Sequence, residues 1–415
     1  MTERSKTAAT STMLADGREL IYFDDGPLAK PHPERDRRPL LPRSTEDSGE
    51  IRYDALTGDW VAVAQHRQTR TYLPPADECP LCPSTDANLS EIPATDYDVV
   101  VFENRFPSLG PALGTAPEHP GWGTSGTAFG RCEVVAFTSA HTGSFGSLSA
   151  QRARTVVDAW AHRTEALSAL PGIRQVFPFE NRGQEIGVTL HHPHGQIYAY
   201  PYVTPRAEVM ARTARTFYDA SGGRDTLTGS ILRSERDSGE RMVLEGEHFS
   251  AYVPFAAHWP LEVHLAPHRQ VADLAGLSGA ERDELAQLYL DLLGRLDRLY
   301  DTPTPYIAAW HQAPLDPVLR PASYLHLQLT SPRRAADKLK FLAGSEAAMG
   351  AFINDTTPEL VAAALRAAAP AGAAFGGGTA AAGLADEGGT AAAGLADDGG
   401  TAAVSAAHLA EGTRG

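Results

Sequence analysis

Apolar positions along the chain follow the same order of patterns twice. In the first half, the strand-like residues 133–137 precede a stretch of helical periodicity that begins at Ser149. In the second half, residues 262–266 precede a similar stretch that begins at Ser278. Apolar residues three and four positions apart are typical of one buried helix face, so a helix is expected after each serine. Glu281, three residues after Ser278, completes the sequence of a capping box.

A second β-rich segment follows each expected helix, at residues 173–203 and at residues 305–330. Strands, helix and strands in this order, repeated in one chain, predict an α+β fold. We expect two similar halves, residues 46–215 and residues 216–365, with a mainly antiparallel sheet flanked by helices. An accidental similarity of the two halves is the alternative.

The two ends of the chain lack this periodicity. Residues 1–45 are rich in proline and charged residues, which predicts a mobile N-terminal arm. From about residue 370 the composition changes to Ala, Gly, Thr and Asp, and an 11-residue unit recurs from residue 377. Its paired glycines and its scarcity of large apolar side chains predict that residues 366–415 form a disordered tail, with a solenoid as the alternative.

The composition fits a soluble globular protein and argues against two other classes. The 415 residues are 42% hydrophobic and 21% charged, and the formal net charge is −15. Such an acidic chain is unsuited to non-specific nucleic-acid binding, which needs a basic surface. Neither a run of about eighteen apolar residues nor a secretory h-region occurs, so we expect no membrane span, no export and a cytoplasmic location.

Three histidines within four positions precede a strand-like alternation of apolar residues. In an extended strand, His192, His194 and Gln196 would share one face, and Pro193 and Gly195 would face the other way. A neutral imidazole, with an unperturbed pKa of about 6.5, is a good nucleophile toward phosphorus near neutral pH. A backbone carbonyl that accepts from Nδ1 of His194 would leave Nε2 free, and the Gln196 amide can donate to a phosphate oxygen. The pattern predicts a histidine nucleophile, with a histidine-rich structural strand as the alternative.

The pair Cys79 and Cys82 has a Cys-x-x-Cys spacing that favours a metal over a structural disulfide. The chain has three cysteines, an odd number, which agrees with that interpretation. His141 and His192 are candidates to complete a tetrahedral Cys₂His₂ zinc site of the closed, structural kind. Loop cysteines without a metal are the alternative.

The motif His-Pro-His-Gly-Gln at residues 192–196 resembles the active-site signature of the galactose-1-phosphate uridylyltransferases, the transferase branch of the histidine-triad superfamily. The hydrolase branch has a third histidine where this chain has Gln196. The resemblance covers about residues 50–360 and implies two histidine-triad-like halves. It implies that His194 is the nucleophile and that Gln196 holds the phosphoryl oxygens. The zinc ligands that it implies are Cys79, Cys82, His141 and His192.

The activity that the resemblance implies is a ping-pong uridylyl transfer of Leloir galactose metabolism. His194 would displace glucose 1-phosphate from UDP-glucose, and galactose 1-phosphate would then take the uridylyl group to give UDP-galactose. A homodimer with shared active sites is implied as well. One alternative is a related nucleotidyltransferase or phosphorylase that acts on an adenylyl donor. Another is a nucleotide-binding zinc protein without turnover.

The resemblance also assigns substrate contacts to residues spread along the chain. The implied contacts of the phosphates and the nucleoside are Arg67, Arg70, Asn104, Arg105, Asn181, Gly187 and Thr189, and those of the hexose phosphate are Lys340, Phe341 and Glu346. Arg105 stands where some members have an aspartate, and Thr189 stands where the family has a serine. Without the resemblance, solvated surface positions would be the better interpretation of Arg67 and Arg70.

Some members of this family hold a second metal, iron or zinc, with a glutamate and three histidines in the C-terminal half. His311 and His326 match two of those histidines, while the third position is Gln328. The glutamate position falls near Met210, with Glu208 close by. These departures predict a degraded or absent second site, in which the two histidines are core residues.

Overall fold

The structure, a computed structural model, describes residues 7–32, 35–42, 49–69, 73–111, 118–119, 121, 123–300 and 302–370. All of them belong to one compact unit, Met1–Phe375. The tail that was expected to be disordered, residues 366–415, begins with two residues of a helix, Pro358–Ala367, and lies outside the described residues from 371 onward. Within the described ranges, no helix combines the length and the apolar surface that crossing a bilayer requires.

Eleven strands of the described part form one large sheet, and each neighbouring pair in it is antiparallel. From one edge to the other they are β1 (Ala8–Met13), β2 (Glu19–Asp24), β5 (Val99–Glu103), β7 (Arg131–Ala136), β9 (His194–Tyr200), β8 (Gln175–Arg182), β13 (Tyr306–His311), β14 (His326–Ser331), β12 (Leu261–Pro267), β11 (Phe249–Tyr252) and β10 (Met242–Glu245).

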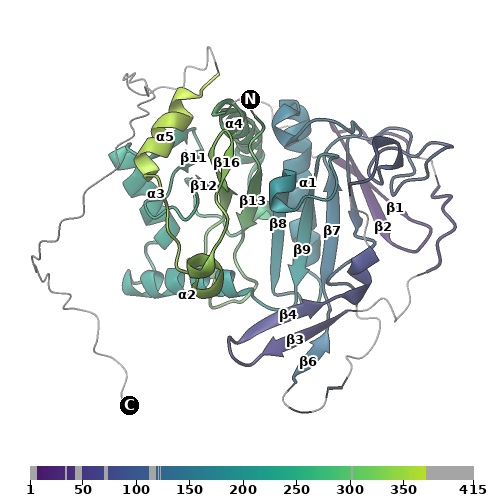
Figure 1. Cartoon of the computed structure of the whole chain (residues 1–415), viewed down its shortest axis with the longest axis horizontal. Coiled ribbons are helices and arrows are strands. Elements are labelled where there is room, and N and C mark those ends of the chain that lie inside the picture. The colour runs from purple at the N-terminus through teal and green to yellow at the C-terminus, as the bar shows by residue number, and fades with distance from the viewer. Residues whose placement is uncertain are drawn as a thin grey trace, which may run out of the picture. The chain divides into compact units, whose positions relative to one another are not determined.

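The sheet contains the expected repeat, arranged outward from its middle. From β8 the first half continues with β9, β7 and β5, and from β13 the second half continues with β14, β12 and β11. Helix α1 (Ala150–Ser168) connects β7 to β8, and helix α4 (Gly279–Arg298) connects β12 to β13. Strands β8 and β13 pair with each other, so both halves share one continuous sheet (Figure 1). The α+β fold with two similar halves is confirmed, while the residue boundaries of the halves stay predictions.

Both helices of the repeat begin after the predicted serine. The Ser149 hydroxyl accepts a hydrogen bond from the Arg152 amide at 3.1 Å, which satisfies one of the donors that a helix start leaves free. Ser278 and Glu281 form the predicted capping box, in which the Glu281 carboxylate lies 2.7 Å from the Ser278 amide nitrogen. The two helices pack against each other and bury apolar side chains, Trp160 among them, in a core that both halves share.

Other elements lie outside the predicted repeat. They are helices α2 (Pro205–Ala220), α3 (Leu227–Ser238) and α5 (Pro358–Ala367), the small sheet of β4 (Asp59–Val63), β3 (Glu50–Asp54) and β6 (Ser125–Thr127), and the pair β15 (Arg333–Ala335) and β16 (Lys338–Leu339). The buried side chains of α2 are Ala207, Ala211 and Ala214. An alanine stripe carries little hydrophobic signal, so the sequence did not reveal this helix.

The prediction of a mobile arm is wrong for the described part of residues 1–45. Strands β1 and β2 form one edge of the large sheet, and β2 pairs with β5. Ile21 and Phe23 belong to the core beneath the helices, and Leu20 and Tyr22 belong to a second apolar cluster on the other face. A strand buried on both faces is a short continuous apolar run, and the surrounding prolines and charges obscured it.

Candidate active site

Strand β9 presents the histidine motif on the face of the sheet that lies opposite α1 and α4. His194 begins the strand and Gln196 follows on the same face, next to Ala136 and Val134 of β7. The alternate residues of the strand, Ile197 among them, are buried beneath the helices. The predicted shared face is found for His194 and Gln196, while His192 lies before the strand and is not part of that face.

Gly195 lies between these two residues at a point where no side chain fits. A β-carbon added there would lie 2.8 Å from the Phe137 ring and 3.0 Å from the Phe179 carbonyl oxygen. Protein interiors are close-packed, so even one methyl group at this position would push β9 away from its neighbours. The close approach therefore holds the backbone of His194 in place.

The imidazole of His194 is oriented through one ring nitrogen. Its Nδ1 lies 2.8 Å from the backbone carbonyl oxygen of His192, so Nδ1–H is the donor and Nε2 keeps its lone pair. Burial lowers the pKa of His194 below its usual range, against the opposing effect of that carbonyl. The imidazole is therefore mainly neutral near pH 7, which is the form that attacks phosphorus.

A cavity of about 360 Å³ opens beside His194 and Gln196. It brings together most of the predicted contacts of the phosphates and the nucleoside. Besides the two motif residues, its lining includes Arg67, Asn104, Arg105, Asn181, Gly187 and Thr189. Arg70 lies outside the described residues.

The loop after β5 forms one wall of this cavity and is held by backbone contacts. The side-chain oxygen of Asn104 accepts from the Phe106 amide at 2.9 Å, and Arg67 donates to the Phe106 carbonyl at 3.0 Å. Apolar side chains complete the lining on this side: Leu81, Phe102, Phe106 and Val134. An apolar wall with a few fixed polar groups suits a planar base, and an arginine suits a phosphate.

The end of β8 and the loop that follows it form another wall. Asn181 lies near the end of β8, and Gly187 and Thr189 lie in the loop. Gly187 has a φ of 84°, in the left-handed region that glycine adopts at little cost. The carbonyl of Thr189 accepts a hydrogen bond from the Leu73 amide at 2.8 Å. These features fix the backbone of the loop where it lines the cavity.

Cys79, Cys82, His141 and His192 form a compact cluster, as the sequence predicted. Their candidate ligand atoms all lie within 4.8 Å of one another. The Cys82 sulfur lies 3.4 Å from Nδ1 of His141 and 3.5 Å from Nδ1 of His192, and the Cys79 sulfur lies 3.7 Å from the latter nitrogen. A tetrahedral zinc ion, with bonds of about 2.3 Å to sulfur and about 2.0 Å to nitrogen, separates such atoms by about 3.5 Å. The four side chains therefore fit a tetrahedral metal ion.

Further contacts orient the ring of His192. Its Nε2 lies 2.7 Å from the Thr138 carbonyl oxygen and 3.1 Å from the Tyr97 hydroxyl. The carbonyl requires a hydrogen on Nε2, so Nδ1 has the lone pair that a metal ligand needs. Because the His192 carbonyl also accepts from His194, a single residue joins the metal-ligand cluster to the candidate nucleophile.

Strand β14 repeats this local geometry in the C-terminal half. His326 begins β14 as His194 begins β9. Nδ1 of His326 lies 3.0 Å from the Tyr324 carbonyl oxygen, two residues earlier, which is the relation that His194 has to His192. The two halves therefore share their strand order and the anchoring of one histidine.

The residues considered for a second metal do not converge on one point. The rings of His311 and His326 are stacked with centroids 5.1 Å apart, and Nε2 of His326 accepts from the Gln328 amide at 3.2 Å. The Gln328 oxygen accepts from Arg206 at 2.9 Å. Glu208 is half exposed and forms an ion pair within α2. These described residues do not fit a metal ion, and the absence of a second metal stays a prediction.

The predicted hexose contacts Lys340, Phe341 and Glu346 do not line the cavity that holds His194. Lys340 is buried, pairs with Glu346 at 3.2 Å and donates to the Ile353 carbonyl. Phe341 is 76% exposed. Within one chain, the structure does not bring these three residues to the site.

Two residues at the site were missed by the sequence analysis. Glu91 lines the cavity, and Arg18 pairs with it at 2.5 Å. These residues are 73 positions apart, and no spacing pattern connects them. The only local signal was a charged residue two positions before the apolar run of β2, at a position where burial requires a partner.

The fold and the site together define a class of protein. It has two similar α+β halves in one antiparallel sheet, and a neutral histidine with a free ring nitrogen beside a cavity suited to a nucleoside phosphate. Sequence models of galactose-1-phosphate uridyl transferase match residues 42–204 as its N-terminal domain and residues 213–373 as its C-terminal domain. The chain belongs to the galactose-1-phosphate uridylyltransferase family, as the motif predicted.

Individual relatives agree with this assignment. The chain is 52% identical over 333 residues to a galactose-1-phosphate uridylyltransferase of Streptomyces lividans, which covers 78% of this chain and 87% of the relative. A solved structure described as uridylyltransferase is 31% identical, with a TM-score of 0.69 over 77% of this chain and 98% of that one. An ADP-glucose phosphorylase from Arabidopsis thaliana is 21% identical, with a TM-score of 0.56 over 77% of this chain and 98% of that one, and shows the fold alone.

Proposed function

We propose that this chain transfers a uridylyl group from UDP-glucose to galactose 1-phosphate through a covalent intermediate on His194. The observation that carries the proposal is the orientation of this imidazole. Its Nδ1 is committed to the His192 carbonyl, and the ring lines the same cavity as Gln196 and Arg67. Membership of the family supports the same substrates.

The proposed reaction is two displacements at one phosphorus atom. Nε2 of His194 attacks the α-phosphorus of UDP-glucose, a P–N bond forms, and the bond to the glucose 1-phosphate oxygen breaks. A phosphate oxygen of galactose 1-phosphate then attacks the same phosphorus and breaks the P–N bond, which restores the imidazole. Arg67, Asn181 and Thr189 are the proposed donors to the phosphate oxygens in both steps. Gln196 donates there too, and its amide is a poor general base for activating water, which favours transfer over hydrolysis.

We propose zinc as the ion that Cys79, Cys82, His141 and His192 hold. Two thiolates and two imidazoles are the ligand set of closed structural zinc sites. When bound, the ion would fix the position of His192 and supply no chemistry to the reacting phosphorus. A pair of thiolate ligands must stay reduced, which supports a cytoplasmic location for the protein.

Intact-protein mass spectrometry after incubation with UDP-glucose tests the reaction directly. We expect a mass increase of one uridylyl group, which disappears when galactose 1-phosphate is added and UDP-galactose forms. An adduct that forms from ADP-glucose and not from UDP-glucose would instead support an adenylyl-transferring enzyme. Absence of an adduct with both donors would support a nucleotide-binding protein without turnover.

We further propose a homodimer in which Lys340, Phe341 and Glu346 of one chain complete the site of the other. The segment around them exposes several large apolar side chains: Phe341, Leu342, Met349 and Ile353. Apolar groups that gather on one short exposed segment are typical of an interface. Glu346 and Lys340 already pair with each other, so the segment has a defined local structure before it meets a partner.

Subunit complementation is the expected consequence of shared sites. His194→Ala and Lys340→Met should each be nearly inactive alone. Mixed under conditions that exchange subunits, they should recover about a quarter of the wild-type rate, because half of the dimers are mixed and each mixed dimer has one intact site. If each site were built from one chain only, mixing would restore no activity. A mixture of His194→Ala with itself after the same treatment is the control.

A further inference from the structure

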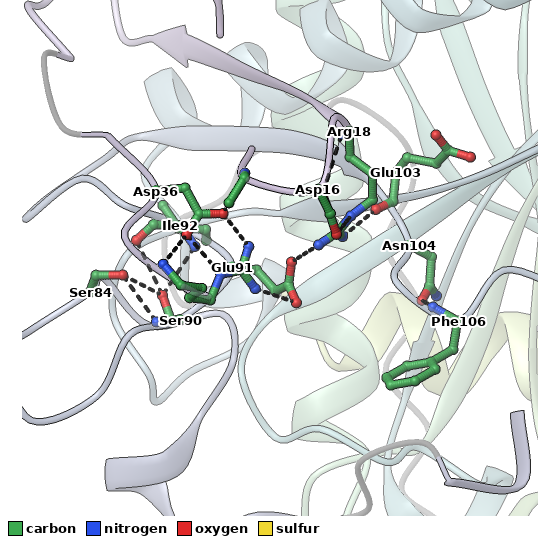
Figure 2. Close-up of polar contacts among 12 residues, drawn as sticks. Asp16, Arg18, Asp36, Ser84, Ser90, Glu91, Ile92, Glu103, Asn104 and Phe106 are labelled. Atoms are coloured by element: carbon green, nitrogen blue, oxygen red, sulfur yellow. Dashed lines mark hydrogen bonds and ion pairs between the residues drawn. The ribbon is translucent and has the colours of Figure 1, made fainter. Parts of the chain in front are cut away.

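Five buried charged side chains form a cluster beside the segment that carries Asn104, and Figure 2 labels four of them, Asp16, Arg18, Asp36 and Glu91. They are Asp16, Arg18, Asp36, Arg38 and Glu91, and each is at most 8% exposed. Four of them belong to the N-terminal segment that was expected to be a mobile arm, and the fifth follows the Cys79–Cys82 pair in the chain. The cluster therefore connects the beginning of the chain to the active-site region.

Glu91 is the centre of this cluster, and two arginines hold its carboxylate. Its Oε2 lies 2.5 Å from Nη2 of Arg18, and its Oε1 lies 2.7 Å from Nη1 of Arg38. Asp16 holds Arg18 from the other side at 2.7 Å, and Asp36 holds Arg38 at 2.8 Å. Burial opposes the charge of Arg38, but its bonds to Asp36 and Glu91 outweigh that effect and raise its pKa.

Two features join the cluster to the cavity wall that Asn104 and Phe106 form. The first is Glu91 itself, which lines the cavity together with Asn104 and Phe106. The second is Nη1 of Arg18, which donates to the Glu103 carbonyl at 2.8 Å. Glu103 directly precedes Asn104, whose amide donates to the Cys132 carbonyl at 2.7 Å. The guanidinium of Arg18 therefore fixes both a cavity-lining carboxylate and the backbone that carries Asn104.

The charge balance of the cluster suggests a role beyond stability. Three carboxylates face two guanidinium groups, so one negative charge remains unbalanced within the cluster. Burying charges costs free energy, and apolar side chains of similar size often stabilise a core as well or better. A carboxylate kept in a cavity wall at that cost is a suitable acceptor for the hydroxyl donors of a ribose.

We propose that Glu91 accepts a hydrogen bond from the ribose of the bound nucleotide, and that Arg18 and Arg38 are positioning residues that hold Glu91 for this contact. The proposal rests on the proposed function, because it requires a ribonucleotide in the cavity. It gives the N-terminal segment a role in nucleotide affinity.

Binding of UMP to the full chain, measured by isothermal titration calorimetry, tests the proposal. We expect Glu91→Gln and Arg18→Met to raise the Kd of UMP about tenfold, because each removes a fixed charged acceptor or its support. Arg18→Lys should raise it less than Arg18→Met, because lysine keeps the charge but loses the planar fork. Wild-type protein should bind UMP more tightly than 2′-deoxy-UMP or 3′-deoxy-UMP, and Glu91→Gln should lose that preference.

Arg163→Met is the matched control, since it breaks another buried arginine–carboxylate pair. Arg163 donates to Glu133 at 2.9 Å and 2.6 Å, and neither residue lines the cavity. It should lower the melting temperature as Arg18→Met does, yet leave the Kd of UMP within about twofold. Equal changes in the Kd of Arg18→Met and Arg163→Met would overturn the positioning role.

Two further outcomes decide the remaining cases. If Arg18→Met does not fold, Glu91→Gln decides alone, because it is nearly isosteric, and an unchanged Kd and an unchanged ribose preference would overturn the proposal. If wild-type protein binds no UMP and forms no uridylyl adduct, the proposed function fails together with this inference. Wild-type binding with unaffected variants would overturn this inference only.

Discussion

The His194→Ala variant is expected to form no uridylyl adduct and to lose about four orders of magnitude or more in kcat. No other described residue that lines the cavity is a histidine, cysteine or lysine, so no second nitrogen or sulfur nucleophile is at hand. The Kd of UMP should change much less than kcat, because Asn104 and Arg67 remain in the cavity. Intact-protein mass spectrometry measures the adduct, and single-turnover release of glucose 1-phosphate measures the loss of rate. Isothermal titration calorimetry measures the Kd of UMP.

His326→Ala is the matched control for this prediction. It removes a histidine that begins the equivalent strand and makes the equivalent Nδ1 contact with a carbonyl two residues earlier. His326 is buried and does not line the cavity that holds His194, so its loss should reduce stability and leave adduct formation nearly unchanged. Equal loss of the adduct in both variants, or an adduct in His194→Ala, would contradict the assigned nucleophile.

The fold could be predicted where large apolar residues recur with one period. Helices α1 and α4 carry such residues on one face, and serine caps mark their starts at Ser149 and Ser278. Helix α2 failed this test because its buried positions are alanines. Strand β2 failed it because both of its faces are buried, which removes the alternation, and because its flanking charges suggested exposure.

Candidate site residues could be predicted where neighbours in the chain act together. His194 and Gln196 lie on strand β9 with His192 two residues before it, and Cys79 with Cys82 has a spacing that metals require. The pairing of Arg18 with Glu91 depends instead on where two distant segments meet in space. The free energy of this ion pair depends on the cost of burying its charges and on a precise geometry of donors, neither of which a linear pattern contains.

The predicted hexose contacts illustrate a different limit. The stretch from Lys340 to Glu346 has the composition that the family resemblance requires, yet within this chain its charged groups bond to each other and to the Ile353 carbonyl. A site shared between subunits is built from residues that no single chain brings together. The motif therefore predicts these residues as contacts, and the complementation experiment tests whether they act in the site of a second chain.

Loss of one metal ligand should have the second largest effect among the predicted substitutions, after His194→Ala. Cys79→Ala is expected to lose about one equivalent of bound zinc and to lower the free energy of unfolding by on the order of 5 kcal/mol. The cluster joins three distant parts of the chain: the Cys79–Cys82 loop, His141 after β7, and His192 before β9. Without the ion, that crosslink is lost, and in this variant the Cys82 thiol remains with two imidazoles in a partly buried site. Metal analysis and urea unfolding measure the two quantities.

Activity should fall as well, although no ligand of the cluster needs to touch the substrate. Pro80 and Leu81, between the two cysteines, line the cavity, and the His192 carbonyl orients His194. Loss of the metal therefore disturbs both the part of the cavity lining at Pro80 and Leu81 and the tautomer of His194. Cys132→Ala is the control, because Cys132 is fully buried outside the cluster, 3.4 Å from the Ser108 hydroxyl. It should keep the zinc and cost about 1 kcal/mol, so equal losses in both cysteine variants would show that burial, and not the metal, stabilises this region.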